Sequence, residues 1–254
     1  MKLKVDSLFW GPEKADIVRG ASLSVRAGEF TGIIGPNGSG KSSLLRCVYR
    51  MNRPRGGRIL LDGEDLWQMP PRVAARKAVS VPQEMPGSLG FTVREVAAMG
   101  RYPHKGMLER ENDEDRRLVE HALECTGMLA HAERPFSSLS GGEKQRTLIA
   151  RAIAQGTEFL ILDEPTNHLD IYYQLEILDL LKGLGNTCLA VMHDLNLAAR
   201  YCDWLYVMRG GSIFAEGRPE DVLSPKLIRD VYRVKASVTP QRETGALQIT
   251  FLGI

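Results

Sequence analysis

A glycine-rich stretch near the start of the chain limits its possible folds more than any other feature. Residues 35–42, Gly-Pro-Asn-Gly-Ser-Gly-Lys-Ser, match the pattern G-x-x-x-x-G-K-[ST] at every specified position. The stretch follows an apolar, strand-like run, Phe30 to Ile34, and precedes a helical pattern, Ser43 to Tyr49. Glycines let the backbone curl so that successive N–H groups point inward, and the helix adds its positive N-terminal end. The sequence therefore predicts a phosphate-binding loop between a strand and a helix.

This phosphate loop, Gly35 to Ser42, predicts a separate task for each kind of residue. We expect Lys41 to neutralise the β- and γ-phosphates of a nucleotide and the Ser42 hydroxyl to ligate Mg²⁺. Backbone contacts to the phosphates are expected from Gly35, Pro36, Asn37, Gly38, Ser39, Gly40 and Ser43. The loop alone leaves kinases, GTPases and many ATPases open.

A second motif is an apolar run that ends in two carboxylates, Asp163 and Glu164. In proteins with a phosphate loop, a strand of this kind lies beside the strand that leads into the loop. Burial up to Leu162 and charge at the tip predict Asp163 as a Mg²⁺ ligand. Glu164, one residue further on, is predicted to accept a hydrogen bond from the attacking water and to act as a general base.

A third motif starts a helical pattern at Leu139 with the sequence Leu-Ser-Gly-Gly-Glu-Lys-Gln-Arg. Ser140 is the expected N-cap, and Gly141 and Gly142 leave the N–H groups of the first turn bare, with Glu143 after them. This makes a second anion site. Because one nucleotide does not easily need two such cradles within a monomer, we expect this one to hold the γ-phosphate of ATP bound to another copy of the chain.

Together the motifs resemble those of ABC ATPase domains. The phosphate loop, the sequence from Leu139 to Glu143, the Asp163-Glu164 pair and His193 occur in the order and rough spacing of that family. The resemblance covers nearly the whole chain. It implies a head-to-tail dimer in which two ATP molecules lie between the phosphate loop of one copy and Ser140 to Glu143 of the other.

The resemblance also assigns roles to residues that would otherwise be unremarkable. Gln83 resembles the glutamine that contacts Mg²⁺ and water, His193 resembles the γ-phosphate sensor, and residues 167–170 resemble the loop that crosses the dimer interface. An aromatic residue near the start usually stacks on adenine in this family. Trp10 fits best, because Trp10-Gly11 precedes an expected strand at Ala15 to Val18, and Phe9 is the competitor.

The expected fold is α/β, a P-loop ABC ATPase fold with a mostly parallel core sheet. Short apolar runs alternate with helical patterns, which favours such a sheet. Before any helix, residues 2–30 hold two or three short strands, which predicts an antiparallel β-subdomain. Between 86 and 138 the strand signal disappears.

We expect one ABC ATPase domain over 1–254, with a helical subdomain over about 86–155 and a C-terminal extension over about 219–254 in which 238–254 adds a hairpin. The predicted strands are Leu23–Val25, Phe30–Ile34, Ile59–Leu61, Val79–Val81, Phe159–Leu162, Leu189–Met192 and Leu205–Met208.

The expected partners follow from charge, hydropathy and resemblance. A net charge of +2 is too small to argue for nucleic acid. No run approaches the roughly 20 apolar residues that span a bilayer, so a membrane role is expected to come from a partner. The stretch Gly-Arg-Tyr-Pro-His at 100–104 is similar to ATPase subunits of bacterial importers for iron chelates, haem and cobalamin. The resemblance implies membrane permease subunits, indirectly a substrate-binding protein, and a peripheral location at the cytoplasmic face of the inner membrane. Import of another small solute or a divalent metal, or a soluble non-transport ATPase, stays open.

Overall fold

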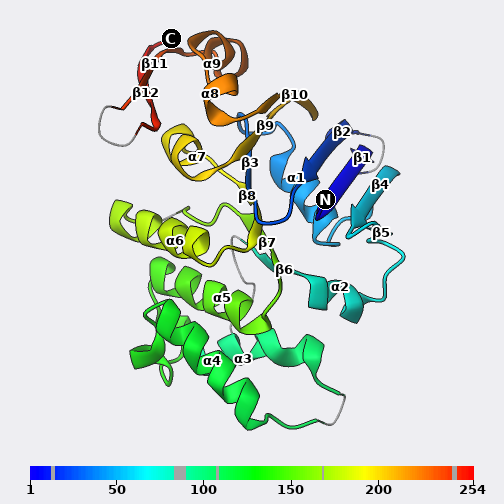
Figure 1. Cartoon of the computed structure of the whole chain (residues 1–254), viewed down its shortest axis with the longest axis vertical. Helices are drawn as coiled ribbons and strands as arrows, with labels where there is room; N and C mark the ends of the chain where they lie inside the picture. Colours follow the sequence, from blue (N-terminus) through cyan, green and yellow to red (C-terminus); the bar gives the residue numbers. More distant parts are fainter. Residues whose placement is uncertain (13–14, 83–89, 107–108, 168, 242–244) are drawn as a thin grey trace. The chain divides into compact units, whose positions relative to one another are not determined.

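The chain passes from one structural unit to a second and back in the computed structural model (Figure 1). The first unit contains Met1–Gln68 and Asn186–Ile254, and the second contains Met69–Gly185. The structure describes residues 1–12, 15–82, 90–106, 109–167, 169–241 and 245–254.

The amino-terminal part of the first unit is an antiparallel sheet with the strand order β2-β1-β4-β5. Leu3, Val5 and Leu8 of β1 are buried, whereas Lys4 and Asp6 between them are exposed, as expected for a sheet with one face on the core. Ladder pairing with β2 begins at Trp10 and Val18. Ala15 to Ile17 therefore precede the strand, and that part of the prediction is wrong: the Ile17 N–H donates to the Trp10 carbonyl and closes the connection instead. The strands are β1 (Leu3–Trp10), β2 (Val18–Val25), β4 (Gly56–Leu61) and β5 (Glu64–Asp65).

Parallel strands form the buried centre of the first unit. β3 pairs in parallel with β8 on one side and with β9 on the other, and β10 joins β9 in antiparallel orientation. Every residue of β3 and β8 is buried, as a strand covered on both faces requires. The elements are β3 (Phe30–Ile34), α1 (Lys41–Val48), β8 (Thr187–Val191), α7 (Leu195–Tyr201), β9 (Trp204–Arg209) and β10 (Ser212–Gly217).

The carboxyl-terminal part of the first unit contains two short helices and a hairpin that begins at Lys235, whereas the sequence predicted a hairpin within 238–254. The side chain of Asn196 in α7 bonds the backbone of the hairpin at Ile249. Its Nδ2 donates to the Ile249 carbonyl at 3.2 Å, and its Oδ1 accepts from the Ile249 N–H at 2.7 Å. The elements are α8 (Pro219–Val222), α9 (Pro225–Tyr232), β11 (Lys235–Pro240) and β12 (Leu247–Gly253).

The second unit is mainly helical around one pair of parallel strands, β6 and β7. Helices α3, α4 and α5 each begin at a capping box, in which the N-cap side chain and the carboxylate three residues later satisfy each other's backbone N–H groups. The elements are α2 (Pro71–Lys77), β6 (Ala78–Val81), α3 (Val93–Ala98), η1 (Met99–His104), α4 (Asp113–Cys125), η2 (Leu129–His131), η3 (Phe136–Ser138), α5 (Gly141–Gln155), β7 (Phe159–Asp163) and α6 (Ile171–Gly183).

The observed architecture confirms the predicted fold class. The core strands are mostly parallel, the amino-terminal sheet is antiparallel, and helices occupy the described residues between β6 and β7. Within the described ranges, no helix combines the length and the apolar character needed to span a bilayer.

Candidate functional site

The phosphate loop connects β3 to α1 with a backbone that only glycine tolerates at its ends. Gly35 has φ +149°, and a Cβ atom there would lie 2.2 Å from the Met208 carbonyl oxygen. Gly40, at φ +101°, would place a Cβ atom 3.0 Å from the Ile17 carbonyl oxygen. Both glycines are therefore required by φ and by the closeness of a neighbouring backbone.

Lys41 lies at the centre of this loop. Its side chain donates from Nζ to the carbonyl oxygens of Gly35 at 2.8 Å and Pro36 at 3.1 Å, and the residue is only 5% exposed. The buried Ser39 hydroxyl has no hydrogen-bond partner among the described residues. A curled backbone around a buried cation, with a spare hydroxyl donor and a helix N-terminus, suits a phosphate group. The loop therefore fits the phosphate groups of a nucleotide such as ATP.

Tyr232, at the end of α9, also contacts the phosphate loop. Burial raises the pKa of its phenol, and a hydrogen bond with the Gly35 backbone opposes that shift. The sequence analysis did not identify this residue, because nothing in the composition of the C-terminal segment shows that it packs against Gly35.

His193 is brought to the same edge of the sheet as the phosphate loop. It follows β8, which runs parallel to β3 with Val191 opposite Ile33. The Met192 N–H donates to the Ile33 carbonyl at 3.0 Å, and the His193 side chain is exposed. The carboxyl ends of parallel strands lie at the same edge of a sheet, and ligands of α/β proteins bind at that edge. His193 therefore lies on the ligand-binding edge of the sheet.

Two aromatic residues compete for the predicted adenine contact at the end of β1. Trp10 is half-buried, whereas Phe9 is 40% exposed. The Phe9 ring lies over Gly20 and Gly56, within 3.6 Å of the positions where their Cβ atoms would be. The Phe9 ring therefore packs against the antiparallel sheet, which favours Trp10 for the adenine contact.

The carboxylate pair ends β7 in the second unit. Asp163 is 3% exposed, and Glu164 adopts the left-handed φ of +56°, which is costly for a residue with a side chain. Asn167 holds Glu164 in place. Its Nδ2 donates to Glu164 Oε2 at 2.9 Å, and its backbone N–H donates to the Glu164 carbonyl at 3.1 Å. The sequence analysis missed this positioning contact.

The start of α5, Ser140 to Glu143, is called the signature turn below. The Ser140 hydroxyl accepts from the Glu143 N–H, and Glu143 Oε2 accepts from the Ser140 N–H at 2.8 Å. Hydrogen bonds from the backbone and then the side chain of Ser140 hold the pKa of the Glu143 carboxyl below its usual range, against the opposing effect of burial. Gly141 is open, because a Cβ atom there would meet nothing within 4 Å. The signature turn is therefore capped by its own side chains, and no other part of the described chain covers Gly141.

The predicted site residues therefore divide between the units. The first unit holds the phosphate loop with Ser43, Trp10 and His193, and the second holds Asp163, Glu164 and the signature turn. Gln83 and His168, on which two further predictions depend, lie outside the described residues.

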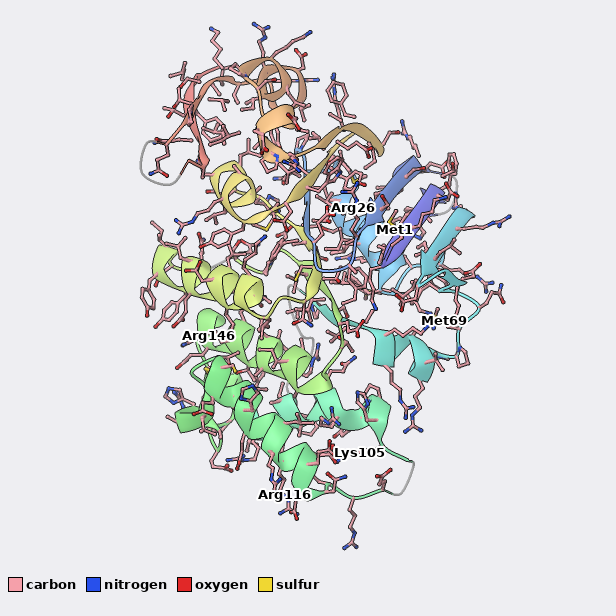
Figure 2. All side chains as sticks on the ribbon, in the orientation of Figure 1. Met1, Arg26, Met69, Lys105, Arg116 and Arg146 are labelled. Atoms are coloured by element: carbon pink, nitrogen blue, oxygen red, sulfur yellow. The ribbon has the colours of Figure 1, made fainter. Side chains whose placement is uncertain are left out.

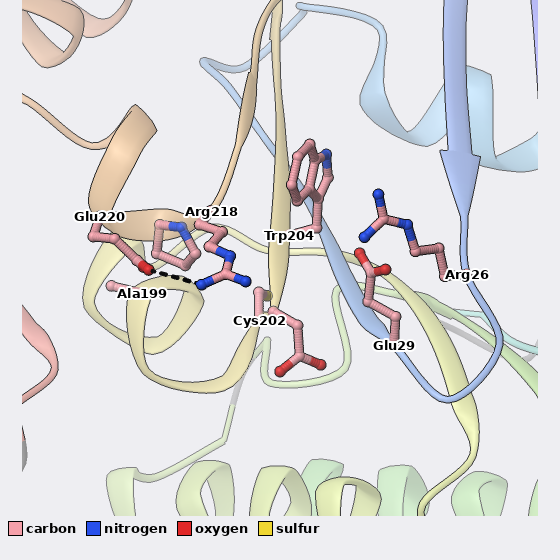
Figure 3. Close-up of a pocket in the computed structure, with 9 residues that line it drawn as sticks. Arg26, Glu29, Ala199, Cys202, Trp204, Arg218 and Glu220 are labelled. Carbon is pink, nitrogen blue, oxygen red and sulfur yellow. Dashed lines mark ion pairs between the residues drawn. The ribbon is translucent and has the colours of Figure 1, made fainter.

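A polar pocket of about 370 Å³ lies at the opposite end of β3 and β9 from the phosphate loop (Figure 3). Arg26 lies over the Trp204 ring at 5.6 Å, and Arg218 pairs with Glu220 at 3.9 Å. Of the described residues that were predicted for nucleotide chemistry, none lines this pocket.

The fold and the phosphate loop define a nucleotide-binding α/β protein, and comparison with known proteins narrows the class. Residues 18–167 match the ABC transporter family. The chain is 42% identical to an iron(3+)-hydroxamate import ATP-binding protein of Bacillus subtilis, over 96% of this chain and 92% of the relative. It is 37% identical to a ferric enterobactin transport ATP-binding protein of Escherichia coli, over 99% and 94%. A solved ATP-binding cassette of an ABC transporter in its ADP conformation superposes with a TM-score of 0.80, at 27% identity over 91% of this chain and 98% of the other.

The chain therefore belongs to the ABC transporter family. Within it, the chain is an ATP-binding and ATP-hydrolysing subunit, and the two relatives above are named for import and transport.

Proposed function

We propose that this chain powers import of an iron–siderophore complex or a related metal chelate, such as haem or cobalamin. The observation that carries this is similarity over nearly the whole chain to subunits named for hydroxamate and enterobactin transport. The similarity includes the helical region over about 86–155, which varies with the membrane partner in this family. The subunit then acts at the cytoplasmic face of the inner membrane as one ABC ATPase domain over 1–254.

We also propose roles for the site residues. Lys41 and the residues Gly35 to Ser43 bind the ATP phosphates, through backbone N–H groups at every position except Pro36, and Trp10 stacks on adenine. Ser42, Gln83 and Asp163 hold Mg²⁺, which neutralises charge on the β- and γ-phosphates. His193 contacts the γ-phosphate, in keeping with its place at the phosphate-loop edge of the sheet.

Hydrolysis in this proposal depends on Glu164. Its carboxylate accepts a proton from water as the water oxygen attacks the γ-phosphorus in line, and the bond from phosphorus to the β,γ-bridging oxygen breaks, leaving ADP and phosphate. The left-handed φ and the Asn167 hydrogen bond hold the carboxylate in one orientation. Such positioning supports this step because phosphoryl transfer is catalysed mainly by positioning and electrostatics.

The complete site requires two copies of the chain. The signature turn exposes the first N–H groups of α5 beside an open Gly141, and its own chain already has a phosphate loop. In a head-to-tail dimer, Ser140 to Glu143 of one copy contact the γ-phosphate held by the other. ATP then acts as the link between the copies, and product formation reopens them.

The permease partner is proposed to contact a groove of about 760 Å³ in the second unit. Phe91 and the 64% exposed Tyr102 line it beside Arg72, Glu95 and Lys105. The turn that presents Tyr102 is firmly anchored, because Arg101 donates to the buried Asp115 at 2.9 Å and Lys105 pairs with the same carboxylate at 3.2 Å. An apolar and charged groove of this kind suits a short helix with an apolar face and charged flanks.

Reconstitution tests the transport assignment. The subunit, its permease and a substrate-binding protein are placed in liposomes, and ATP hydrolysis is measured with the binding protein loaded with ferric hydroxamate, ferric catecholate, haem, cobalamin or a free divalent metal. We expect stimulation by one of the chelates. Stimulation by the free metal alone, or by none of the loads, would overturn metal-chelate import while leaving the ATPase assignment intact.

A Glu164→Gln variant tests the catalytic assignment. Removing the general base should lower kcat by about 10²- to 10⁴-fold while ATP binding persists. Turnover is measured by phosphate release and binding by equilibrium dialysis, with Glu158→Gln, shortly before β7, as the control. Turnover close to wild type would exclude Glu164 as the base.

A further inference from the structure

A set of side-chain contacts, joined by short backbone links, connects α5 to Glu164 within the second unit. It starts at α5, crosses the first turn of α6 and ends at the segment after β7. Arg146 of α5, Tyr173 and Gln174 of α6, and Asn167 before α6 carry it. Figure 2 labels Arg146 on the α5 ribbon.

Arg146 makes the first contact. Its guanidinium carbon lies 4.6 Å from the centre of the Tyr173 ring, and Nη1 lies 3.9 Å from Glu176 Oε2. The side chain is 14% exposed, and its Nε is buried without a hydrogen-bond partner among the described residues. A partly buried cation that lies over an aromatic face and beside a carboxylate makes an orientation-dependent contact, which plain apolar packing between two helices would not need.

The signature turn also touches the same elements through Gly142. A Cβ atom at Gly142 would lie 3.3 Å from Leu169 Cδ2 and 4.0 Å from Tyr173 Cδ2. The signature turn therefore lies so close to Leu169 that even a methyl group at Gly142 would be a tight fit. A shift of α5 relative to α6 changes both the Gly142 and the Arg146 contacts.

Gln174 and Asn167 make the remaining contacts. Gln174 Nε2 donates to the carbonyl oxygens of Leu169 at 3.0 Å and Thr166 at 3.3 Å. Asn167, which lies between these two residues, donates to Glu164 Oε2 at 2.9 Å. Tyr173 and Gln174 are adjacent in the first turn of α6. Tyr173 contacts Arg146 of α5, and Gln174 bonds the loop that follows Glu164.

We infer that Arg146, Tyr173 and Gln174 are positioning residues that orient Glu164 according to the state of the signature turn in the same chain. This rests on the proposed function, in which the signature turn contacts the ATP of the second copy and Glu164 hydrolyses the ATP of its own copy. A γ-phosphate bound at the signature turn thereby determines the orientation of Glu164 at the ATP site of the same chain. Glu164 suits this control because its left-handed backbone persists only while its neighbours hold it.

The test compares Tyr173→Leu, Tyr173→Phe, Arg146→Gln and Gln174→Met in the full-length chain with its permease. Tyr173→Phe keeps the aromatic face and should stay within about twofold of wild type. The other three should lower kcat about 10-fold with little change in KM for ATP, because they release the base without touching the nucleotide. Arg116→Gln, which removes an exposed cation of α4, is the control and should leave kcat unchanged.

Two further measurements separate positioning from folding and binding. Melting temperatures identify any variant that loses activity by unfolding, and Gln174→Met carries the test if Arg146→Gln does not fold. In a Glu164→Gln background, ATP-driven dimerisation measured by sedimentation should be unchanged by Tyr173→Leu. Equal losses in Tyr173→Phe and Tyr173→Leu, or a rise in KM with unchanged kcat, would overturn the inference. Normal turnover of Glu164→Gln alone would instead refute the proposed catalytic role.

Discussion

The phosphate loop and the signature turn use the same physics in opposite ways. Both present backbone N–H groups at the start of a helix. The phosphate loop is closed within the chain, since a Cβ atom at Gly35 would collide with the Met208 carbonyl and Lys41 is enclosed by loop carbonyls. The signature turn is open, since Gly141 has no neighbour within 4 Å. The phosphate loop is thus packed against its own chain, whereas the signature turn leaves Gly141 open, as the proposed contact with the ATP of a second copy requires.

Gly35→Ala should produce the largest effect, because it breaks the closed site. The substitution combines a disfavoured φ with a backbone collision and should cost about 3 kcal/mol of unfolding free energy, together with ATP binding. Urea unfolding measures the loss. Gly38→Ala, at φ +75° with nothing within 4 Å, is the matched control and should cost only about 1 kcal/mol. Equal losses at both positions would show that the collision does not matter.

Gly141→Leu should have little effect on stability but should interfere with association. The open surroundings predict a stability change within about 0.5 kcal/mol. A bulky side chain over the bare N–H groups should weaken ATP-driven dimerisation by about 10-fold, or about 1.4 kcal/mol. Gly183→Leu, at another open helical glycine, should leave dimerisation intact. A stability loss like that of Gly35→Ala would remove the contrast between the two sites.

Acid should weaken the signature turn through Glu143. Because the folded-state pKa lies below the ordinary 4.5, the carboxylate stabilises the fold above that value and loses its effect as pH falls through the folded pKa. Near pH 7, Glu143→Gln keeps the capping hydrogen bond but removes the charge beside the helix N-terminus, and should cost about 0.5 kcal/mol. Urea unfolding over a pH series should show this difference shrinking below pH 4.5. A constant difference across the series would refute this role of the Glu143 charge.

Tyr232→Phe should have only a small effect on ATP binding and tests the support behind the phosphate loop. Losing the hydrogen bond to the Gly35 backbone should cost about 1 kcal/mol of stability and lower ATP affinity about twofold. Tyr206→Phe removes a hydroxyl that bonds Ser24, away from the loop, and should cost similar stability with normal ATP affinity. Isothermal titration distinguishes the two. Identical affinities would mean that Tyr232 does not support the loop.

Local features of this protein could be predicted because their causes lie within a few residues. The phosphate loop needs glycines at set positions between a strand and a helix, and β3 spans Phe30–Ile34 as predicted. The Ser140 cap is equally local, because an N-cap and its third neighbour recognise each other across one turn. The predicted start of β2 was wrong because a hydrogen bond between Ile17 and Trp10, on the far side of a turn, decides where pairing begins.

Sequence by itself determined the α/β class, the phosphate loop and the capped signature turn, since each depends on residue type at short spacing. Only the tertiary structure decided that Tyr232 meets Gly35 and that Arg146 lies over Tyr173. These contacts join segments whose individual patterns carry no sign of each other. Their physical cause is the packing of helices and strands around a common core, which brings together side chains that no local periodicity relates.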